Sequence, residues 1–191
     1  MKCEVCEHNN VRSVLDLGLH PLCDDLIPVG AEDICLEYQI ELGLCENCLT
    51  MHQMHPVEKK TLFPQNYHYR SRLTGDVILG MDDLVRSLQD VTGSLRGKKV
   101  LDIGCNDGSL LDIFSSKGAI TVGVEPTNAA NDASGRQHSI YKEYFNTELA
   151  ERLKYEHGLF DFITFTNVFA HIEDLDSLLN AISILQNEES I

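Results

Sequence analysis

The sequence predicts an α/β protein in two parts, a small cysteine-rich metal-binding module followed by a parallel sheet with helices on both faces. Two Cys-x2-Cys pairs lie within the first 48 residues, and short apolar strands alternate with helices from about residue 98 onward. A glycine-bearing turn follows the first of these strands. We therefore divide the chain into a module at 1–60, a linker with a helix at 61–97, and an α/β domain at 98–191.

Composition and charge exclude several classes of protein. The 191 residues are 43% hydrophobic and 24% charged, as in ordinary globular proteins. No apolar run reaches the roughly 18 residues of a membrane span, and the N-terminus lacks the apolar stretch of a secretory signal. We expect a cytoplasmic protein without a membrane partner. A net charge of −15 repels nucleic acid, although a local basic groove or a site for one small anion stays open.

The cysteines are arranged as metal ligands. Seven cysteines in a chain without an export signal favour thiolate chemistry over disulfides. Each Cys-x2-Cys pair can form a backbone knuckle that points two thiolates at one ion, and two knuckles complete a closed tetrahedral zinc site. The predicted ligands are Cys3, Cys6, Cys45 and Cys48. A closed site has no position for a substrate, so we expect a structural zinc; unmetallated or redox-active cysteines are the alternatives.

Four further residues lie near these pairs in the sequence. His52 or His55 could replace a cysteine ligand, but the two pairs already supply four, so we favour solvated or outer-shell histidines. Cys23 and Cys35 belong to no pair, and we expect them to be small buried residues.

The spacing of apolar residues predicts the order of strands and helices. The module has strands at 11–17 and 36–44, and a helix with one apolar face follows at 74–91. The later strands are expected at 100–103, 120–124, 139–145 and 160–166, and the helices at 108–117, 129–134, 147–155 and 176–185. Strands joined by crossover helices of this length form a parallel sheet. Ser190 and Ile191 resemble the start of a fifth strand, which suggests a sheet truncated after four β-α units whose exposed edge favours self-association.

The turn after the strand at 100–103 has the features of a cofactor loop. Gly104 allows a tight turn and close approach to a ligand. Asp102, at the end of the strand, can accept a hydrogen bond from a bound cation or from water. Asp107 lies beside the following helix, where it either contacts the cofactor or caps the helix N-terminus.

The loop favours S-adenosylmethionine over a dinucleotide. Dinucleotide sites use Gly-x-Gly-x-x-Gly, but Asn106 replaces the second glycine here and Asp107 would repel a pyrophosphate. A ligand that carries an ammonium and a sulfonium tolerates both groups. Glu125 ends the next strand, where an acid can accept both ribose hydroxyls; a surface glutamate is the alternative. The predicted cofactor residues are Asp102, Gly104, Cys105, Asn106, Asp107, Gly108, Glu125 and Asn167.

Two more segments are candidates for substrate contact. Asn167 and His171 follow the strand at 160–166, at the sheet edge where such folds bind ligands. Asn167 could contact the methionine part or the substrate. His171 is our candidate catalytic base, with a packing or capping role as the alternative. Tyr67 and Tyr69, just before the helix at 74–91, either contact the cofactor or substrate or pack between the modules.

These motifs, in this order, resemble those of the sugar C-methyltransferase family. The shared features are the two cysteine pairs, Leu-Gly-Leu-His-Pro-Leu at 17–22, Asp-Ile-Gly-Cys-Asn-Asp-Gly at 102–108, Gly-Val-Glu-Pro at 123–126 and Asn-Val-Phe-Ala-His-Ile at 167–172. The resemblance implies a class I methyltransferase with a Rossmann-like sheet and an N-terminal zinc domain. Such enzymes methylate C3 of nucleotide-linked keto-deoxysugars.

The resemblance also implies a mechanism. A base removes a proton next to the sugar ketone, and the enolate attacks the cofactor methyl group. Key His and Tyr residues of the family lie in a further C-terminal domain that these 191 residues lack, so we expect no turnover by this chain alone. A methyltransferase acting on a small molecule, with a nucleotide-linked sugar as the expected substrate, is the leading hypothesis. A non-catalytic zinc- and cofactor-binding scaffold and a dinucleotide-dependent oxidoreductase are the alternatives, and Asn106 and Asp107 disfavour the latter.

Overall fold

The protein consists of two compact units. The computed structural model describes residues 1–23, 26–172 and 174–191. Contacts divide the chain into Met1–Pro64 and Gln65–Ile191, and each unit has its own sheet. Residues 65–97 therefore belong to the second unit together with the α/β domain.

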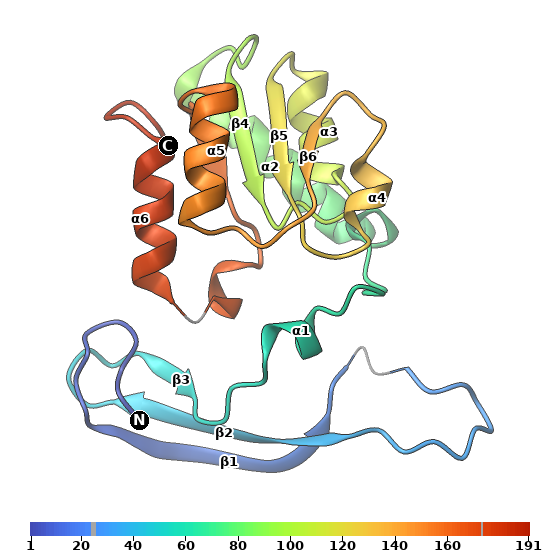
Figure 1. Ribbon diagram of the computed structural model, residues 1–191, viewed down its shortest axis with the longest axis vertical. Coiled ribbons are helices and arrows are strands. Elements are labelled where there is room, and N and C mark those ends of the chain that lie inside the picture. Colours follow the sequence, from blue (N-terminus) through green and yellow to red (C-terminus); the bar gives the residue numbers. More distant parts are fainter. Residues whose placement is uncertain (24–25, 173) are drawn as a thin grey trace. The chain divides into compact units, whose positions relative to one another are not determined.

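The first unit is a small antiparallel sheet in the order β1-β2-β3 (Figure 1). Strands β1 (Val11–Pro21) and β2 (Glu37–Cys45) confirm the two predicted strands, although β1 continues four residues past its expected end. The pairing register of β1 shifts twice, between Ser13 and Leu15 and between Asp16 and Gly18, so its ladder with β2 is irregular at both points. Strand β3 (Met51–Gln53) and helix α1 (Lys59–Leu62) were not predicted, because such short elements show no periodicity.

The loop region before β2 departs from one prediction. We expected Cys23 and Cys35 to be buried, but Cys23 is exposed and Cys35 is half-buried. Large apolar residues around them, such as Val29 and Ile34, are also exposed in this unit. The prediction was wrong because the described residues of this region form no buried apolar cluster that could enclose a small side chain.

The second unit contains the predicted parallel sheet. Its strands are β4 (Lys99–Ile103), β5 (Ile120–Val124), β6 (Ser139–Tyr141) and β7 (Phe162–Thr164). They pair in parallel in the order β6-β5-β4-β7. The chain runs outward from β4 to β6 and then crosses to β7 on the other side of β4. A reversal of this kind creates the crevice in which doubly wound sheets bind ligands, at the carboxyl ends of the strands.

Two strands are shorter than predicted, and the last residue extends the sheet. Strand β6 ends at Tyr141 and β7 spans only three residues. The backbone N–H of Ile191 donates to the carbonyl of Asp161 at 3.0 Å, and its carbonyl accepts from the N–H of Ile163 at 2.8 Å. This is the hydrogen-bond pattern of parallel pairing, so Ile191 pairs with β7, although no strand is assigned at this residue.

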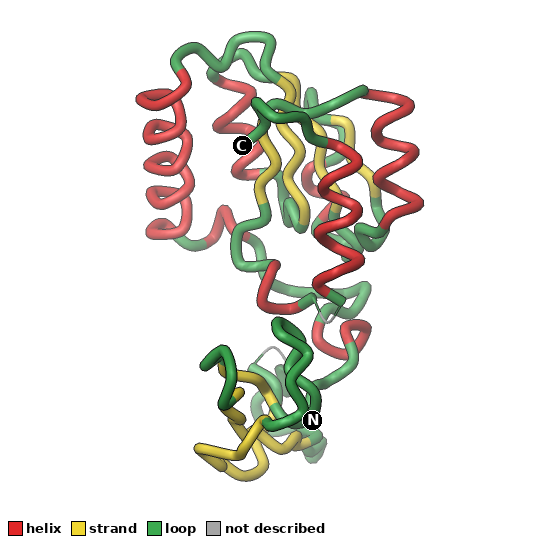
Figure 2. Tube along the Cα trace, turned by 90° about the vertical axis from the view of Figure 1, so that its left-hand side faces the viewer, coloured by secondary structure: helices red, strands yellow, loops and turns green. Residues whose placement is uncertain are grey.

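Helices cover both faces of this sheet (Figures 1 and 2). They are α2 (Gly75–Thr92), α3 (Ser109–Ser116), α4 (Ala130–Ala133), α5 (Thr147–His157) and α6 (Leu175–Leu185). Val100 of β4 packs with Val85 of α2 and Phe114 of α3 in one buried cluster. The next residue, Leu101, packs with α5 and α6 in another. Neighbouring residues of a strand point to opposite faces, so β4 is buried on both sides. Among the described residues, no helix is both long and apolar enough to cross a membrane.

Candidate metal centre and cofactor site

Both cysteine pairs adopt the same backbone turn. In each, the carbonyl of the first cysteine accepts the N–H of the residue four positions on, at 3.0 Å for both Cys3 and Cys45. The N–H of the same cysteine donates to the carbonyl five positions on, at 2.8 Å for Cys3 and 2.9 Å for Cys45. The residue after each pair, Glu7 or Leu49, is left-handed with φ of +59° or +62°. The sequence thus forms two matched knuckles.

The four sulfur atoms fit one zinc ion. The Sγ atoms of Cys3 and Cys48 are 3.6 Å apart, as are those of Cys6 and Cys45, and all four lie within 4.8 Å of one another. Zn–S bonds of about 2.3 Å in a tetrahedron place sulfurs roughly 3.8 Å apart. All four predicted ligands therefore meet at one point, and the two first cysteines of the pairs are buried.

Polar side chains surround the sulfurs. The amide of Asn47 donates to Cys6 Sγ at 3.4 Å, and Thr50 Oγ1 lies 3.1 Å from Cys48 Sγ. Hydrogen bonds from Thr50 lower the pKa of Cys48 to about 6, whereas burial raises the pKa of Cys3 to about 11. Groups of this kind orient thiolates and stabilise their charge when a metal is bound.

The two histidines near this centre lie outside the set of four sulfurs. His52 is buried and its Nε2 is 3.3 Å from Cys3 Sγ, the position of an outer-shell partner. The Nε2 of His55 is 2.8 Å from a carboxylate oxygen of Glu41. The sequence favoured solvated or outer-shell histidines over direct ligation; His52 has an outer-shell position, whereas His55 is exposed and pairs with Glu41.

The cofactor loop is fixed to the end of the neighbouring strand. The N–H groups of Gly104 and Cys105 both donate to the carbonyl of Val124, at 2.7 and 3.1 Å. Gly104 has φ of +73°, and a Cβ there would lie 2.3 Å from a methyl carbon of Val168. Glycine is needed both for the turn and for this close packing.

Two buried groups lie beneath this loop. Asp102 accepts a hydrogen bond from Thr164 Oγ1 at 2.8 Å, and burial raises its pKa to about 7. Burial and the nearby acids raise the pKa of the Cys105 thiol well above its usual value. An acid with a pKa near neutrality, at the carboxyl edge of the sheet, is suited to a cationic ligand.

Glu125 is held from both sides. Its Oε2 accepts the N–H of Asn106 at 3.1 Å, and its Oε1 accepts the N–H and hydroxyl of Thr127 at 2.9 and 2.6 Å. A carboxylate can accept about four hydrogen bonds, so this buried acid keeps capacity for a ligand donor. Burial raises the pKa of the Tyr144 phenol, and the charge of Glu125 raises it further.

Asp107 comes two residues before α3, and its carboxylate bonds both the start of that helix and the segment before α2. Its Oδ1 accepts the N–H and hydroxyl of Ser109, the first residue of α3, at 3.2 and 2.6 Å, and its Oδ2 accepts the N–H of Arg72 at 3.0 Å. Gly108 has φ of +78°, and a Cβ there would lie 2.8 Å from the Cβ of Ala133. Both residues therefore shape the loop and its junction with α3.

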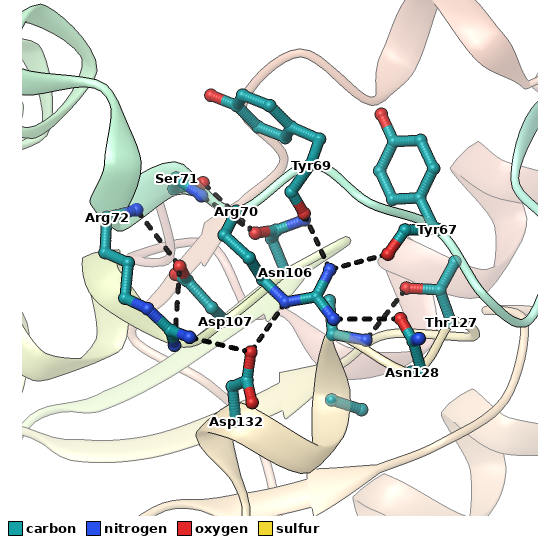
Figure 3. A network of polar contacts seen from close by, with 12 residues as sticks. Tyr67, Tyr69, Arg70, Ser71, Arg72, Asn106, Asp107, Thr127, Asn128 and Asp132 are labelled. Atoms are coloured by element: carbon teal, nitrogen blue, oxygen red, sulfur yellow. Dashed lines mark hydrogen bonds and ion pairs between the residues drawn. The ribbon is translucent and has the colours of Figure 1, made fainter. Parts of the chain in front are cut away.

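A segment that carries no motif joins the site. Residues 65–73, named here the strap, lie against the cofactor loop and contain a 3₁₀ turn at Ser71–Leu73. The side-chain Oδ1 of Asn106 accepts the N–H of Ser71 at 3.0 Å, and its Nδ2 donates to the carbonyl of Tyr69 at 3.2 Å (Figure 3). The sequence suggested Tyr67 and Tyr69 as possible contacts of this site. It gave no signal for Arg70, Thr127, Asn128, Asp132 or Thr164.

The last candidates lie in the turn after β7. Asn167 is exposed and left-handed, with φ of +56°, a conformation that asparagine tolerates better than most residues. His171 ends the 3₁₀ turn Phe169–His171, is exposed, and donates its N–H to the carbonyl of Val168 at 2.9 Å. Because Val168 packs on Gly104, this turn borders the cofactor loop.

The fold and site define a class of protein. A parallel sheet with a glycine turn after β4 and a buried acid after β5 is a nucleoside-binding α/β arrangement. A family model described as "Methyltransferase domain" matches residues 75–188, and one described as "Putative zinc binding domain" matches residues 3–63. The chain belongs to the methyltransferase-domain family, which sets aside the oxidoreductase alternative.

Individual relatives agree with this assignment. The C-methyltransferase NovU of Streptomyces niveus is 30% identical over 189 residues, which are 96% of this chain and 44% of NovU. A ubiquinone biosynthesis O-methyltransferase of Acinetobacter baylyi is 28% identical over 102 residues, 51% of this chain and 43% of that protein. The chain thus spans less than half the length of these curated relatives.

A solved structure shares the fold. The plantazolicin methyltransferase BpumL, in complex with a pentazolic desmethylPZN analog and SAH, matches with a TM-score of 0.50 and 19% identity. The match covers 62% of this chain and 46% of BpumL. A likeness at this identity supports the Rossmann-like methyltransferase fold.

Proposed function

We propose that the protein is an S-adenosylmethionine-dependent C-methyltransferase that acts on a small molecule, a nucleotide-linked keto sugar. The observation that carries this proposal is the match to the C-methyltransferase NovU, which extends along both units of the chain. The O-methyltransferase relative matches over only 51% of the chain. The sequence motifs that resemble sugar C-methyltransferases point to the same substrate class.

The buried acids support the choice of cofactor. Glu125, held between Asn106 and Thr127, would accept the ribose hydroxyls, and Asp102 would face the positively charged methionine part directly or through water. The carboxylate of Asp107 lies at the start of α3, where its charge would repel a pyrophosphate. Asn167, at the end of β7, would contact the methionine part or the acceptor.

The chemistry needs one base and one methyl donor. S-adenosylmethionine supplies an electrophilic methyl group on a sulfonium. A base of the protein would remove the acidic proton beside the sugar ketone, and the carbon would then bond to the methyl group that the cofactor supplies, with the electron pair of the broken methyl–sulfur bond left on sulfur. His171, exposed in the turn that borders the cofactor loop, is the proposed base within this chain.

The four-cysteine centre would hold a structural zinc. Its closed set of sulfurs leaves no open position for a substrate, so the ion would stabilise the first unit and take no part in methyl transfer.

Isotope labelling tests this proposal. The full-length protein is incubated with methyl-labelled S-adenosylmethionine and a nucleotide-linked keto-deoxysugar. We expect label on the carbon next to the ketone, and exchange of that carbon's proton with deuterated water when S-adenosylhomocysteine replaces the donor. Label on an oxygen acceptor, with none on the sugar carbon, would contradict C-methylation.

A further inference from the structure

Arg70 makes an unusually complete set of contacts for a strap residue. Its Nε donates to Asp132 at 2.6 Å, its Nη1 donates to the carbonyls of Tyr67 and Tyr69 at 2.7 and 2.9 Å, and its Nη2 donates to Asn128 Oδ1 at 2.9 Å (Figure 3). The side chain is only 14% exposed. All three nitrogens of the guanidinium therefore have acceptors within the protein.

These contacts join the strap to the turn after β5. Asn128 and Asp132 lie in and beside α4, which follows Glu125 in the chain. The strap is bound there a second time, because the N–H of Asn128 donates to the carbonyl of Gln65 at 3.0 Å, and the Gln65 amide donates to the carbonyl of Pro126 at 2.9 Å. The turn that carries Thr127 is thus fixed on both sides.

The same strap fixes the cofactor loop. Tyr69 and Ser71, the two neighbours of Arg70, bind the side-chain amide of Asn106. Asn106 is left-handed with φ of +50°, a conformation that asparagine adopts more readily than most residues, and the strap holds its side chain there. Its N–H donates to one oxygen of Glu125, and Thr127 donates to the other. Arg70 thus connects the two loops that orient this carboxylate.

The charge of Arg70 is balanced within the protein, so its role here is to hold neighbouring segments in position. A hydrogen bond from Arg70 is the largest cause of the lowered pKa of Asp132, and Arg72 lies 3.1 Å from the same carboxylate. Asp107 lies 4.0 Å from Arg72, so two arginines face two acids. A lysine has one donor atom where Arg70 uses three nitrogens in a planar fork, so it cannot replace these contacts.

We propose that Arg70 is a positioning residue for the adenosyl cofactor, which holds the strap across the loops of Asn106 and Thr127 and thereby sets the orientation of Glu125. The inference rests on the proposed function, because Glu125 is the group that would bind the ribose. Arg70 itself touches no ligand atom in this account, so its effect passes through the carboxylate.

Calorimetric titration with S-adenosylhomocysteine tests the proposal. We expect Arg70→Ala and Arg70→Lys each to weaken binding about tenfold, because losing charge-assisted hydrogen bonds has effects of this order. Asn128→Ala, which removes one contact at the far loop, should weaken it less. The matched control is Arg86→Ala, since Arg86 is an exposed arginine of α2 paired with Asp82 and Asp83. This variant should bind S-adenosylhomocysteine with the affinity of the unaltered protein.

A double-mutant cycle separates positioning from a general loss of stability. If Arg70 acts through Glu125, Arg70→Ala should cost little affinity in a Glu125→Ala background. Equal losses in both backgrounds would overturn the proposal, as would full affinity in Arg70→Lys. If Arg70→Ala does not fold, the same cycle with Asn128→Ala decides. Failure of the unaltered protein to bind S-adenosylhomocysteine would instead overturn the proposed function, so the two failures are distinguishable.

Discussion

The two units of the protein differ in what stabilises the fold of each one. Among the described residues of Met1–Pro64, the buried hydrophobic side chains are those of Cys3 and Cys45, both ligands of the candidate metal centre. The second unit instead buries large side chains such as Leu101, Phe114 and Leu153 between sheet and helices. A metal centre can replace an apolar core in a small unit, whereas a larger domain is stable through burial.

Metal removal should therefore destabilise the first unit and leave the second unit folded. This is the largest effect that we expect. Structural zinc contributes on the order of 10 kcal/mol or more to the folding of small zinc domains. A strong chelator should unfold Met1–Pro64 while Gln65–Ile191 keeps its circular dichroism and its cooperative melting. Cys45→Ser should behave like the chelated protein. If the amide signals of β1 and β2 persist in nuclear magnetic resonance spectra of the metal-free protein, the first unit does not depend on the metal and this difference between the units is contradicted.

The converse change removes core packing from the second unit. Phe114 of α3 is fully buried, and replacing such a residue with alanine costs about 3–5 kcal/mol of unfolding free energy. Urea unfolding of Phe114→Ala should show that loss in the second unit with zinc content unchanged. Leu79→Ala is the control, because Leu79 is 62% exposed on α2. A similar loss in both variants would mean that burial is not what stabilises this unit.

Cofactor affinity should depend on the second unit alone. Glu125→Ala should weaken binding of S-adenosylhomocysteine by about 1–3 kcal/mol, because hydrogen bonds to a charged group are lost. Zinc content, measured by atomic absorption, should stay at one ion per chain. Equal affinity in the variant and the unaltered protein would remove Glu125 from the site.

The smallest effect is a pH dependence from Asp102. Its pKa is raised from 3.8 to about 7, so the folded protein without cofactor carries it protonated below that pH. A cationic ligand prefers the ionised form, so affinity should fall as pH drops below about 7, by at most tenfold per pH unit. The same raised pKa has the opposite effect on the free energy of unfolding. The contribution of Asp102 to it is fully present below about pH 4 and is lost as the pH rises from there through 7. Asp102→Asn should flatten the dependence of affinity on pH between pH 6 and 8. An unchanged slope in this variant would mean that another group causes the pH dependence.

The sequence predicted the elements whose signals are local. The strand ending at Ile103, its glycine turn and helix α2 follow from apolar spacing over a few residues. The cysteine pairs predicted the metal centre for the same reason, since each knuckle is formed within six residues.

What the sequence could not show depends on contacts between distant segments. Arg70 meets Asp132 across 62 positions of the chain, and no spacing rule connects a strap before α2 with a turn after β5. Asp107 had two possible roles in the sequence, cofactor contact or helix capping, and its contacts with Ser109 and Arg72 could be seen only in the structure. Cys23 was expected to be buried from residue type alone, but the exposure of a cysteine depends on whether a core exists around it.

The most direct test of the account is a calorimetric titration of the native protein with S-adenosylhomocysteine, with NAD as the competing ligand. We predict one S-adenosylhomocysteine site per chain and no heat from NAD, because Asn106 replaces the second glycine of the dinucleotide motif and Asp107 would repel a pyrophosphate. Saturable binding of NAD, or the absence of S-adenosylhomocysteine binding by zinc-loaded protein, would contradict the account.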